Sequence, residues 1–589
     1  MKRSRESGPR NRNLTRMAAE VDVCVFRKEE KMSENISRRG FLGGAVASAL
    51  AVGASSLGMG SHFRAYANES VNDDIKDVVG RDFPERMRTE PIEPVAPPAT
   101  WDDEADVVVV GTGGGMAAAA RAVEQGHKVI LIDKRPDTGG GSKEASAFVA
   151  PGTKVQEALG MPDVSDKLLG ASLASAPFGS RYAAYTTNVV ESAKRLVNWT
   201  VDQGFAWQPT TVTGGAGPVA LSPAGSEEGG MTARAMSYLF DFLEKKYLDN
   251  GGDLRLKTEA VALVKDGDRV VGIKVKDWNG KEAYIKANNG VLLATGGMAA
   301  NRPLLKKYIP TCYECAKFST AGTQDTGDGI LMGLGAGANF AGFDTYDRFD
   351  GGVNGVDWNT HMYAAAVQIV RQPWLGIDIN GERYPYFEGS FNEFTAAAKQ
   401  LESLPGHQGY VFFDNKYEEY GPTFHQNMCR LLIDEDTMPD AKRLKNSIVN
   451  NNWRDGVKKA VDDGLVVQGD TIAEVAEKLG MDPAKAEKAV EEWNKICAEG
   501  TDPEGKMPDE FLHPIEQGPF YGAAIGSFVF STHAGLAVDD KGEVLDTKGN
   551  PIPGLYASGN TVGYPMAQAN GSCCFSSATA NLAVESMFA

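Results

Sequence analysis

The chain has few of the residue types that build metal centres and covalent haem sites. Its 589 residues include 7 cysteines and 7 histidines, and neither an H-E-x-x-H nor a C-x-x-C-H sequence occurs. These absences exclude a covalently attached haem and argue against a metal site. Cys312 and Cys315 could form a redox pair or half of a metal site. No second pair has ligand spacing, however, so structural or free thiols fit better.

Positive charge is also scarce. The 60 lysines and arginines are outnumbered by 78 aspartates and glutamates, which gives a net charge of −18. No basic run with interleaved aromatic residues offsets this excess. The composition therefore argues against nucleic acid or an anionic membrane surface as a partner. An acidic surface instead suits a soluble exported protein with a basic electron-transfer partner.

A long apolar run is missing too. Residues 43–60 are mildly apolar, but they are too rich in glycine, alanine and serine for a membrane span of about 20 residues. They follow Ser37-Arg-Arg-Gly-Phe-Leu42 and precede Ala65-Tyr-Ala67, which match a twin-arginine signal and its cleavage site. Residues 1–67 are therefore predicted to be an N-terminal extension and signal peptide. We expect export to the periplasm or to the outer face of the cytoplasmic membrane.

Glycine, by contrast, is abundant, with 67 residues, and one glycine-rich turn is informative. Val107-Val-Val-Val110 predicts a buried parallel strand, Gly111-Thr-Gly-Gly-Gly115 follows it, and an alanine-rich segment then predicts a helix. A second strand over residues 128–132 ends at Asp133. In such a βαβ unit the glycines let the backbone approach a pyrophosphate at a helix N-terminus. The acid about 20 residues further on can accept hydrogen bonds from an adenosine ribose. The pattern predicts dinucleotide binding.

The turn departs from the usual G-x-G-x-x-G pattern in one place. Met116 stands where the third small residue is expected, flanked by Gly115 and Ala117. We expect the close packing of helix on strand to be made through Gly115.

The remaining pattern predicts an α/β protein in which a Rossmann-like dinucleotide-binding domain is interrupted by an inserted α+β capping domain. Residues 68–100 form a linker that is rich in proline from residue 85, and the first part of the binding domain covers residues 101–307. The capping domain covers 308–530. Residues 531–589 return to strand, glycine and helix patterning, and complete the binding domain. Helices are predicted at 191–203, 232–250, 471–479, 483–498 and from 572, and strands at 253–276, 290–297, 535–538 and 554–560.

A set of short motifs runs in one order from Trp101 to the end of the chain. Together they resemble the fumarate reductase/succinate dehydrogenase flavoprotein family, which includes soluble fumarate reductases, urocanate reductases and 3-ketosteroid Δ1-dehydrogenases. Besides the first glycine turn with Asp133-Lys134, the motifs are Gly139-Gly-Gly-Ser142, Leu293-Ala-Thr-Gly-Gly297, Thr326-Gly-Asp-Gly329, Asn380-Gly-Glu-Arg-Tyr384, Gly518-Pro-Phe-Tyr521 and Pro553-Gly-Leu-Tyr-Ala-Ser-Gly-Asn560.

The resemblance implies FAD as the cofactor, with a cap domain closing over the flavin. It places the first glycine turn at the pyrophosphate, Asp133 at the adenosine ribose, Ser142 near the flavin, and Asp328 and Asn560 at the ribityl chain and flavin edge. A helix starting near residue 572 would direct its N-terminus at the flavin C2 carbonyl. No histidine has the spacing of a covalent flavin link, so non-covalent FAD is expected. The full predicted set is Gly111, Gly113, Gly114, Gly115, Asp133, Lys134, Ser142, Asp328, Gly559 and Asn560.

Two departures from the family argue against fumarate as the substrate. Fumarate reductases have a proton-donating arginine shortly after an Asn-Glu pair, but Phe387-Glu-Gly-Ser-Phe-Asn392 contains none. They hold a substrate carboxylate with a second arginine, and Tyr564-Pro-Met-Ala-Gln-Ala-Asn-Gly571 contains none. The steroid dehydrogenases have a tyrosine near this second place. Tyr564 stands a few residues early and Cys574 stands near their later glycine, so neither subfamily fits.

The favoured function is an extracytoplasmic FAD-dependent reductase of a carbonyl-conjugated C=C bond, with hydride from flavin N5 and a proton from a side chain. Candidate proton donors are Tyr564, His533 and His361, although each could be a packing residue instead. Arg371 fits a structural ion pair better than a catalyst. The aromatic residues of the cap are compatible with a small unsaturated substrate that carries an aromatic or polycyclic ring.

Electrons would have to come from a separate cytochrome or flavoprotein, because the chain has no haem motif and exported proteins have no NADH pool. This arrangement suggests anaerobic respiration. Two alternatives stay open: a dehydrogenase of a 3-ketosteroid or another bulky ring ketone, and an exported flavin electron carrier without substrate chemistry.

Overall fold

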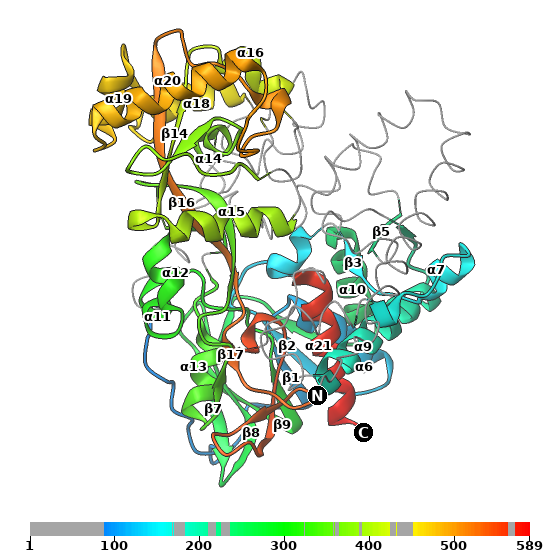
Figure 1. Ribbon diagram of the computed structural model, residues 1–589. Helices are drawn as coiled ribbons and strands as arrows, with labels where there is room; N and C mark the ends of the chain where they lie inside the picture. The colour runs from blue at the N-terminus through cyan, green and yellow to red at the C-terminus, as the bar shows by residue number, and fades with distance from the viewer. Residues whose placement is uncertain are drawn as a thin grey trace, which may run out of the picture.

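A computed structural model describes residues 87–145, 147–167, 169, 183–209, 220–224, 236–322, 324–356, 358–359, 365–387, 391–424, 432, 452–563 and 572–589. Its two large sheets each have their own hydrophobic core. In Figure 1 one sheet lies low in the view with β1, β2 and β9, and the other lies above it with β14 and β16. Within the described part of the chain, no helix is both long and apolar enough to cross a bilayer.

The first sheet has eight strands in the order β18-β19-β9-β1-β2-β6, with β8 pairing to β9 and β7 to β8. The central strand β1 runs parallel to both β2 and β9. Val107, Val108 and Val109 are fully buried, as is usual for the central strand of a parallel sheet that is covered on both faces. The bounds are β1 Asp103–Val110, β2 Val129–Ile132, β6 Asp253–Arg255, β7 Thr258–Asp266, β8 Arg269–Asp277, β9 Glu282–Leu293, β18 Glu543–Leu545 and β19 Pro551–Ala557.

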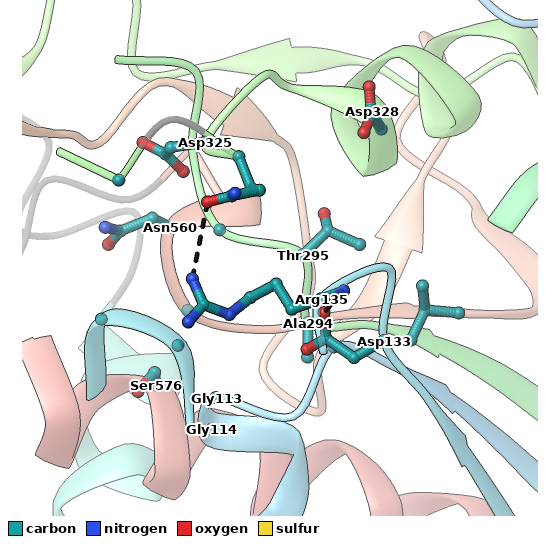
Figure 2. Close-up of a pocket in the computed structure, with 18 of the residues that line it drawn as sticks. Gly113, Gly114, Asp133, Arg135, Ala294, Thr295, Asp325, Asp328, Asn560 and Ser576 are labelled. Atoms are coloured by element: carbon teal, nitrogen blue, oxygen red, sulfur yellow. Dashed lines mark hydrogen bonds between the residues drawn. The ribbon is translucent and has the colours of Figure 1, made fainter. Parts of the chain in front are cut away.

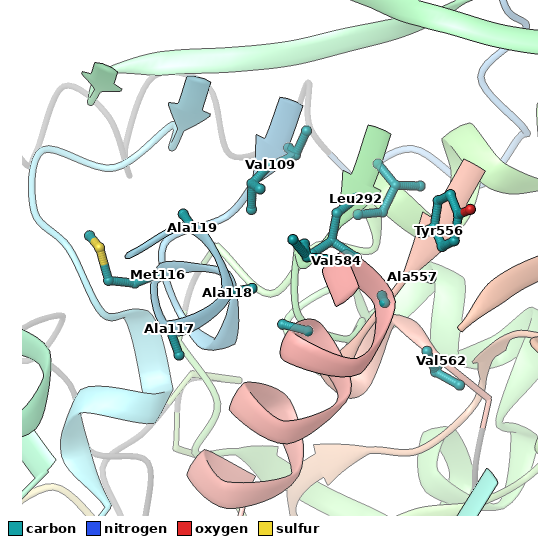
Figure 3. Packing of buried hydrophobic residues seen from close by; sticks show 14 of the residues in the cluster. Val109, Met116, Ala117, Ala118, Ala119, Leu292, Tyr556, Ala557, Val562 and Val584 are labelled. Carbon is teal, nitrogen blue, oxygen red and sulfur yellow. The ribbon is translucent and has the colours of Figure 1, made fainter. Parts of the chain in front are cut away.

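Two helices from opposite ends of the chain pack together against this sheet. Helix α6 (Gly114–Glu124) follows β1, and α21 (Ser572–Met587) comes from the C-terminus. Figure 3 shows the small side chains of α6 and Val584 of α21 facing Val109, Leu292 and Ala557 of three strands. Alanines keep the helices close to each other and to the strands. Helices α9 (Ala183–Asp202) and α10 (Met236–Asp249) pack outside them.

The second sheet is built on one long strand, β16 (Phe520–Thr532), which pairs with four others. Its partners are β10 (Ala316–Ser319), β12 (Tyr346–Val353), β14 (Gly409–Phe413) and β15 (Val467–Gly469), and β13 (Leu375–Ile377) pairs with β14. The helices of this half are α14 Ala365–Val370, α15 Phe391–Ser403, α16 Tyr417–Tyr420, α18 Trp453–Asp462, α19 Ile472–Lys478 and α20 Pro483–Glu499.

Smaller elements complete the first half. They are α7 Lys154–Ala158, α11 Arg302–Tyr308, α12 Pro310–Cys315, α13 Asp328–Gly335, a three-stranded sheet of β3 Phe148–Val149, β4 Trp207–Pro209 and β5 Ala220–Pro223, and the pair β11 Phe340–Ala341 and β17 Gly535–Leu536. The strands predicted over 253–276 are β6, β7 and β8 in the structure, whereas the loop predicted before residue 232 contains β4 and β5.

The predicted α/β class with a Rossmann-like first domain is confirmed. The C-terminal elements β18, β19 and α21 complete the first sheet, so the second sheet is inserted into it. The predicted cap range of 308–530 is not uniform, however. Ile330, Leu331 and Met332 of α13 belong to the first core, so the chain returns to the first half before β12 enters the second sheet.

The described part of the predicted linker lies along the first half as an arm. Val95 forms an isolated bridge with Val264 of β7, and the Ile92 N–H donates to the Leu331 carbonyl at 2.9 Å. The arm therefore touches both β7 and α13, which flank the cavity described next.

Candidate cofactor site

One cavity opens where the carboxyl ends of β1, β2 and β9 meet, and its empty space, including the solvent at its open mouth, is about 1270 Å³. In parallel α/β sheets this edge is the usual place for a ligand. The cavity continues to the second sheet, because Phe530 and Ser531 of β16 belong to its wall. Nine of the ten predicted cofactor residues line it, as Figure 2 shows in part: Gly111, Gly113, Gly114, Asp133, Lys134, Ser142, Asp328, Gly559 and Asn560.

Three glycines of the first turn are required by protein packing. A Cβ on Gly111, whose φ is +108°, would lie 2.2 Å from the Ala294 carbonyl oxygen. A Cβ on Gly114 would lie 2.1 Å from the Ser576 carbonyl oxygen of α21. A Cβ on Gly115 would lie 2.7 Å from Val109 Cγ1, so the close packing of α6 on β1 is indeed made through Gly115. This residue is buried under the turn and is absent from the described lining.

The N-terminus of α6 faces open space. Its N-cap residue, Gly113, provides no side-chain hydrogen bond, and a Cβ there would meet nothing closer than 3.5 Å. Gly141, which also lines the cavity, has nothing within 4 Å of its own Cβ position. Uncapped helix amides and the helix dipole attract an anion, and the glycines leave room for it. The residues present therefore fit the pyrophosphate of a dinucleotide.

Asp133 is held rigidly at the end of β2. Its Oδ2 accepts from the backbone N–H of Thr112 at 2.8 Å and from the Thr112 hydroxyl at 2.6 Å. Its Oδ1 accepts from the Arg135 N–H at 2.9 Å. The carboxylate still lines the cavity, and each oxygen can accept further hydrogen bonds. This position suits the predicted contact with ribose hydroxyls.

Two predicted cofactor residues pair with each other. Lys134 Nζ lies 2.6 Å from Asp328 Oδ2 and 2.9 Å from the Thr326 hydroxyl. The side chains of Lys134 and Asp328 are 16% and 13% exposed, so the ion pair is largely shielded from water. It connects the end of β2 to the start of α13.

Near the other end of the cavity wall, Ser142 and Ser576 of α21 share a hydrogen bond of 2.8 Å between their hydroxyls. The Gly559 N–H donates to the Thr579 hydroxyl at 2.9 Å, and the following Asn560 lines the cavity beside Asp325. The first turns of α21 are thus joined to the cavity wall on two sides.

Three charged residues of the wall were not predicted: Arg135, Glu259 and Asp325. Arg135 is 6% exposed, and its Nη1 donates to Gln324 Oε1 at 3.5 Å; a dashed line from Arg135 marks this bond in Figure 2. Asp325 accepts from the Ala299 N–H at 3.1 Å, and burial raises the pKa of its carboxyl to about 6. Asp325 directly precedes a family motif, which could have drawn attention to it. No sequence signal marks Arg135 as a wall residue.

Of the three candidate proton donors, Tyr564 and His361 lie outside the described residues. His533 is described, and it lies just behind the cavity wall. Its Nε2 is 2.7 Å from Asp347 Oδ2, and the nearby Ser531, which does line the cavity, donates to the same oxygen at 2.9 Å. Burial lowers the pKa of His533, but the Asp347 carboxylate outweighs it and leaves the pKa above its usual value. Ser531 was missed by the sequence analysis.

Arg371 and the two cysteines of α12 lie in buried surroundings that indicate a structural role. Arg371 forms the expected buried ion pair, with its Nη2 2.9 Å from Asp350 Oδ1. Cys312 and Cys315 of α12 are buried free thiols, as expected. The described residues contain no group of three or more histidine, cysteine or acidic side chains that could hold a metal ion.

Comparison with known proteins identifies the family. Residues 106–576 match the FAD binding domain family; this match covers most of the chain and includes the glycine turn and the start of α21. The chain belongs to this family. It is a FAD-dependent oxidoreductase, and the predicted resemblance to fumarate reductase-type flavoproteins is confirmed, because its relatives also include fumarate and acrylate reductases.

Two similar curated proteins are reductases. The chain is 28% identical over 508 residues to a urocanate reductase of Eggerthella lenta. The aligned region covers 84% of this chain and 75% of the relative. It is 27% identical over 469 residues to a vinyl phenol reductase of Lactiplantibacillus plantarum. The aligned region covers 78% of this chain and 90% of this relative.

A solved structure has the same fold. The 3-ketosteroid Δ1-dehydrogenase of Sterolibacterium denitrificans aligns with a TM-score of 0.62 and 21% identity, covering 82% of this chain and 99% of that one. At this identity the likeness concerns the fold alone.

Proposed function

We propose that the protein is an FAD-dependent reductase of a C=C bond conjugated to a carbonyl group, and that fumarate is not its substrate. The observation that carries the proposal is the extent of the cavity. It runs from the ribose-binding position at Asp133 to Ser531 of the second sheet, so one space can receive a dinucleotide and reach the cap. Relatives that reduce double bonds support the reductive direction.

The chain's own residues account for cofactor binding. The N-terminus of α6 receives the pyrophosphate, Asp133 accepts from the ribose, and the Lys134–Asp328 pair holds the wall between them. When bound, FAD supplies the hydride that the reduction needs. The carbonyl group of the substrate is required because it stabilises the negative charge that hydride addition creates.

The charge of the wall argues for a substrate without a fumarate-like pair of carboxylates. Among the described lining residues the only cations are Lys134 and Arg135, and both follow β2 at the end where Asp133 lies. The second sheet contributes Phe530 and Ser531 to the described wall. An arginine on the substrate side would bind a carboxylate at two points. The described wall has no such arginine, and the sequence has none in residues 387–392 and 564–571, where fumarate reductases have theirs. We propose an uncharged or singly charged substrate, with an aromatic ring tolerated.

We further propose that FAD is bound without a covalent link. The described lining contains no histidine, cysteine or tyrosine, the side chains that commonly tether a flavin. Precipitation of the purified protein with acid should release all of its flavin into the supernatant. Yellow colour retained in the washed pellet would contradict this proposal.

Export and the electron donor are proposals that rest on sequence. The predicted twin-arginine signal lies outside the described residues, and a separate cytochrome or flavoprotein would supply electrons. Replacing Arg38 and Arg39 together by lysine should leave the precursor in the cytoplasm, whereas the unaltered chain should be processed and exported. Equal export of both forms would contradict the signal.

The main test uses the FAD-loaded protein from Asn68 onward, reduced by a viologen dye without oxygen. Dye reoxidation is followed against conjugated acids, enones, aryl alkenes and lactones, with fumarate and urocanate included. Reoxidation by one class supports the proposal and identifies the substrate type. Rapid turnover of fumarate would overturn the argument from missing arginines. No reoxidation by any acceptor would favour a dehydrogenase or an electron carrier.

A further inference from the structure

Three polar side chains connect the cavity wall to the molecular surface at the end of β16. Ser531 lines the cavity and donates to Asp347 Oδ2 at 2.9 Å. The same carboxylate oxygen is 2.7 Å from His533 Nε2, and this nitrogen is 3.4 Å from the Ser531 hydroxyl. A single carboxylate oxygen therefore joins a cavity hydroxyl to an imidazole.

The backbone fixes this arrangement. Asp347 of β12 and Ser531 of β16 are directly opposite each other in the antiparallel register, so their side chains lie on the same face of the sheet. The His533 N–H donates to the Thr345 carbonyl at 3.0 Å, which anchors the histidine to the segment that leads into β12. The cluster is thus positioned by strand pairing rather than by flexible loops.

The cluster is slightly exposed and has a defined charge. The side chains of Asp347 and His533 are each 14% exposed, whereas Ser531 is 7% exposed. Among the described residues, Asp347 is the charged group that contacts His533. Although burial lowers the pKa of His533, this carboxylate outweighs the effect and raises the pKa above its usual value, which favours the protonated imidazole.

We propose that Ser531 is the catalytic residue that delivers the proton of the reduction, and that His533 and Asp347 are positioning residues that restore it. The inference rests on the proposed reductase function. As the substrate carbanion takes the proton at the carbon next to its carbonyl group, the Ser531 O–H bond breaks and a C–H bond forms. The serine oxygen then takes the proton from His533 Nε2, and the neutral imidazole takes a proton from water. Asp347 stays ionised throughout.

This relay changes the role of His533. The sequence suggested that the histidine itself could protonate the substrate, but it lies behind Ser531 and outside the described cavity wall. A hydroxyl at the wall with an acid–imidazole pair behind it can pass on one proton per turnover without moving the pair. The two electrons of the new C–H bond belong to the carbanion that hydride addition leaves, so the step needs no further reductant.

The test compares four FAD-loaded proteins: the wild type, Ser531→Ala, Asp347→Asn and the control Ser527→Ala. Ser527 is a fully buried serine of the same strand that is absent from the described wall. FAD content is measured first. Turnover of an acceptor identified in the viologen assay is then followed from about pH 5 to about pH 9, in water and in deuterium oxide.

We expect the wild-type kcat to fall as pH rises through the raised pKa of His533. Asp347→Asn should move this fall to lower pH, because the carboxylate that raises the pKa is lost. Ser531→Ala should lower kcat about 100-fold with FAD content retained, which is typical of losing a general acid. It should also remove the pH-dependent fall and change the solvent isotope effect. Ser527→Ala should behave as the wild type does.

The outcomes separate the relay from the reductase proposal. If the wild type reduces an acceptor while Ser531→Ala and Asp347→Asn keep its pH profile and isotope effect, the relay is overturned and the reductase stands. A loss of turnover in Ser527→Ala equal to that in Ser531→Ala would assign the effect to strand packing and overturn the relay. If Ser531→Ala loses FAD, the profile of Asp347→Asn decides: a shift supports the relay and no shift overturns it. If the wild type reduces no acceptor, both proposals fail.

Discussion

Lys134 Nζ lies 2.6 Å from Asp328 Oδ2, and this ion pair joins segments 194 residues apart across the wall of the cofactor cavity. One segment is the end of β2, next to Asp133, and the other is the start of α13. The surrounding wall shields both charges, so each depends on the other for compensation. The pair therefore holds the end of β2 against the start of α13 and neutralises both charges in the cavity wall.

Removing one partner of this pair should weaken FAD binding. In Lys134→Met the Asp328 carboxylate loses its counter-ion and keeps the hydrogen bond from the Thr326 hydroxyl, at a cost of about 1–3 kcal/mol or roughly 10- to 100-fold in affinity. Flavin fluorescence titration of the cofactor-free protein measures the change. Lys245→Met, which breaks an exposed ion pair with Asp249, is the control and should leave the affinity unchanged. An unaltered FAD affinity in Lys134→Met would disprove this role of the pair.

Two glycine substitutions should have opposite signatures. Gly114→Ala places a methyl group where the Ser576 carbonyl oxygen would be 2.1 Å away, so it should push α6 from α21 and destabilise the protein by about 3 kcal/mol even without FAD. Gly141→Ala meets no protein atom within 4 Å and projects into the cavity wall. It should change the stability of the cofactor-free protein by no more than about 1 kcal/mol but weaken FAD binding. Thermal unfolding with and without FAD distinguishes them, and equal destabilisation of both FAD-free variants would refute this assignment.

The sequence predicted the features that depend on neighbouring residues. The run of valines, the glycine turn and Asp133 all belong to one βαβ unit, whose geometry follows from short-range patterning. Helices such as α19 and α20 were predicted to within one residue, because a capping residue precedes each and a hydrophobic stripe continues through it. Glycine-rich and proline-rich segments were harder, so β4 and β5 were predicted as loop.

Features that depend on distant residues were not predictable in the same way. Nothing near Lys134 indicates that its partner is Asp328, since the pairing follows from how α13 returns to the first core. Ser531 is one of many serines in the sequence, and only the register of β12 with β16 places it opposite Asp347. Arg135 reads as an ordinary surface arginine after a strand, yet it lines the cavity. Long-range packing, rather than local preference, decides these positions.

The buried thiols should be unreactive in the folded protein. Cys312 and Cys315 are 0% and 3% exposed, and burial raises the pKa of Cys315 to about 11 and that of Cys312 well above its usual value. A thiol reacts as the thiolate, so iodoacetamide near pH 8 should label neither residue until the protein is unfolded. Mass spectrometry of peptides after native and denatured labelling is the measurement. Rapid native labelling of either cysteine would point to a redox role for the pair instead.

Asp325 should make the stability of the cofactor-free protein fall as pH rises through weakly acidic values. Burial raises the pKa of its carboxyl from 3.8 to about 6, although the Ala299 N–H favours the ionised form. The folded state therefore keeps its proton when the unfolded state has already lost it. The stabilisation is complete below about pH 4 and is lost as pH rises to about 6, by at most about 3 kcal/mol.

Asp325→Asn removes this titration and nearly preserves the shape of the side chain. Above pH 6 the variant should be more stable than the wild type, and the difference in unfolding free energy should shrink as pH falls towards 4. Urea unfolding of both FAD-free proteins across this range provides the comparison. Asp539→Asn, at an acid that lies away from the cavity, serves as a control for the general effect of removing one negative charge. A pH-independent difference between the wild type and Asp325→Asn would show that the carboxyl titrates normally, and the cavity would then be wetter around Asp325 than its burial implies.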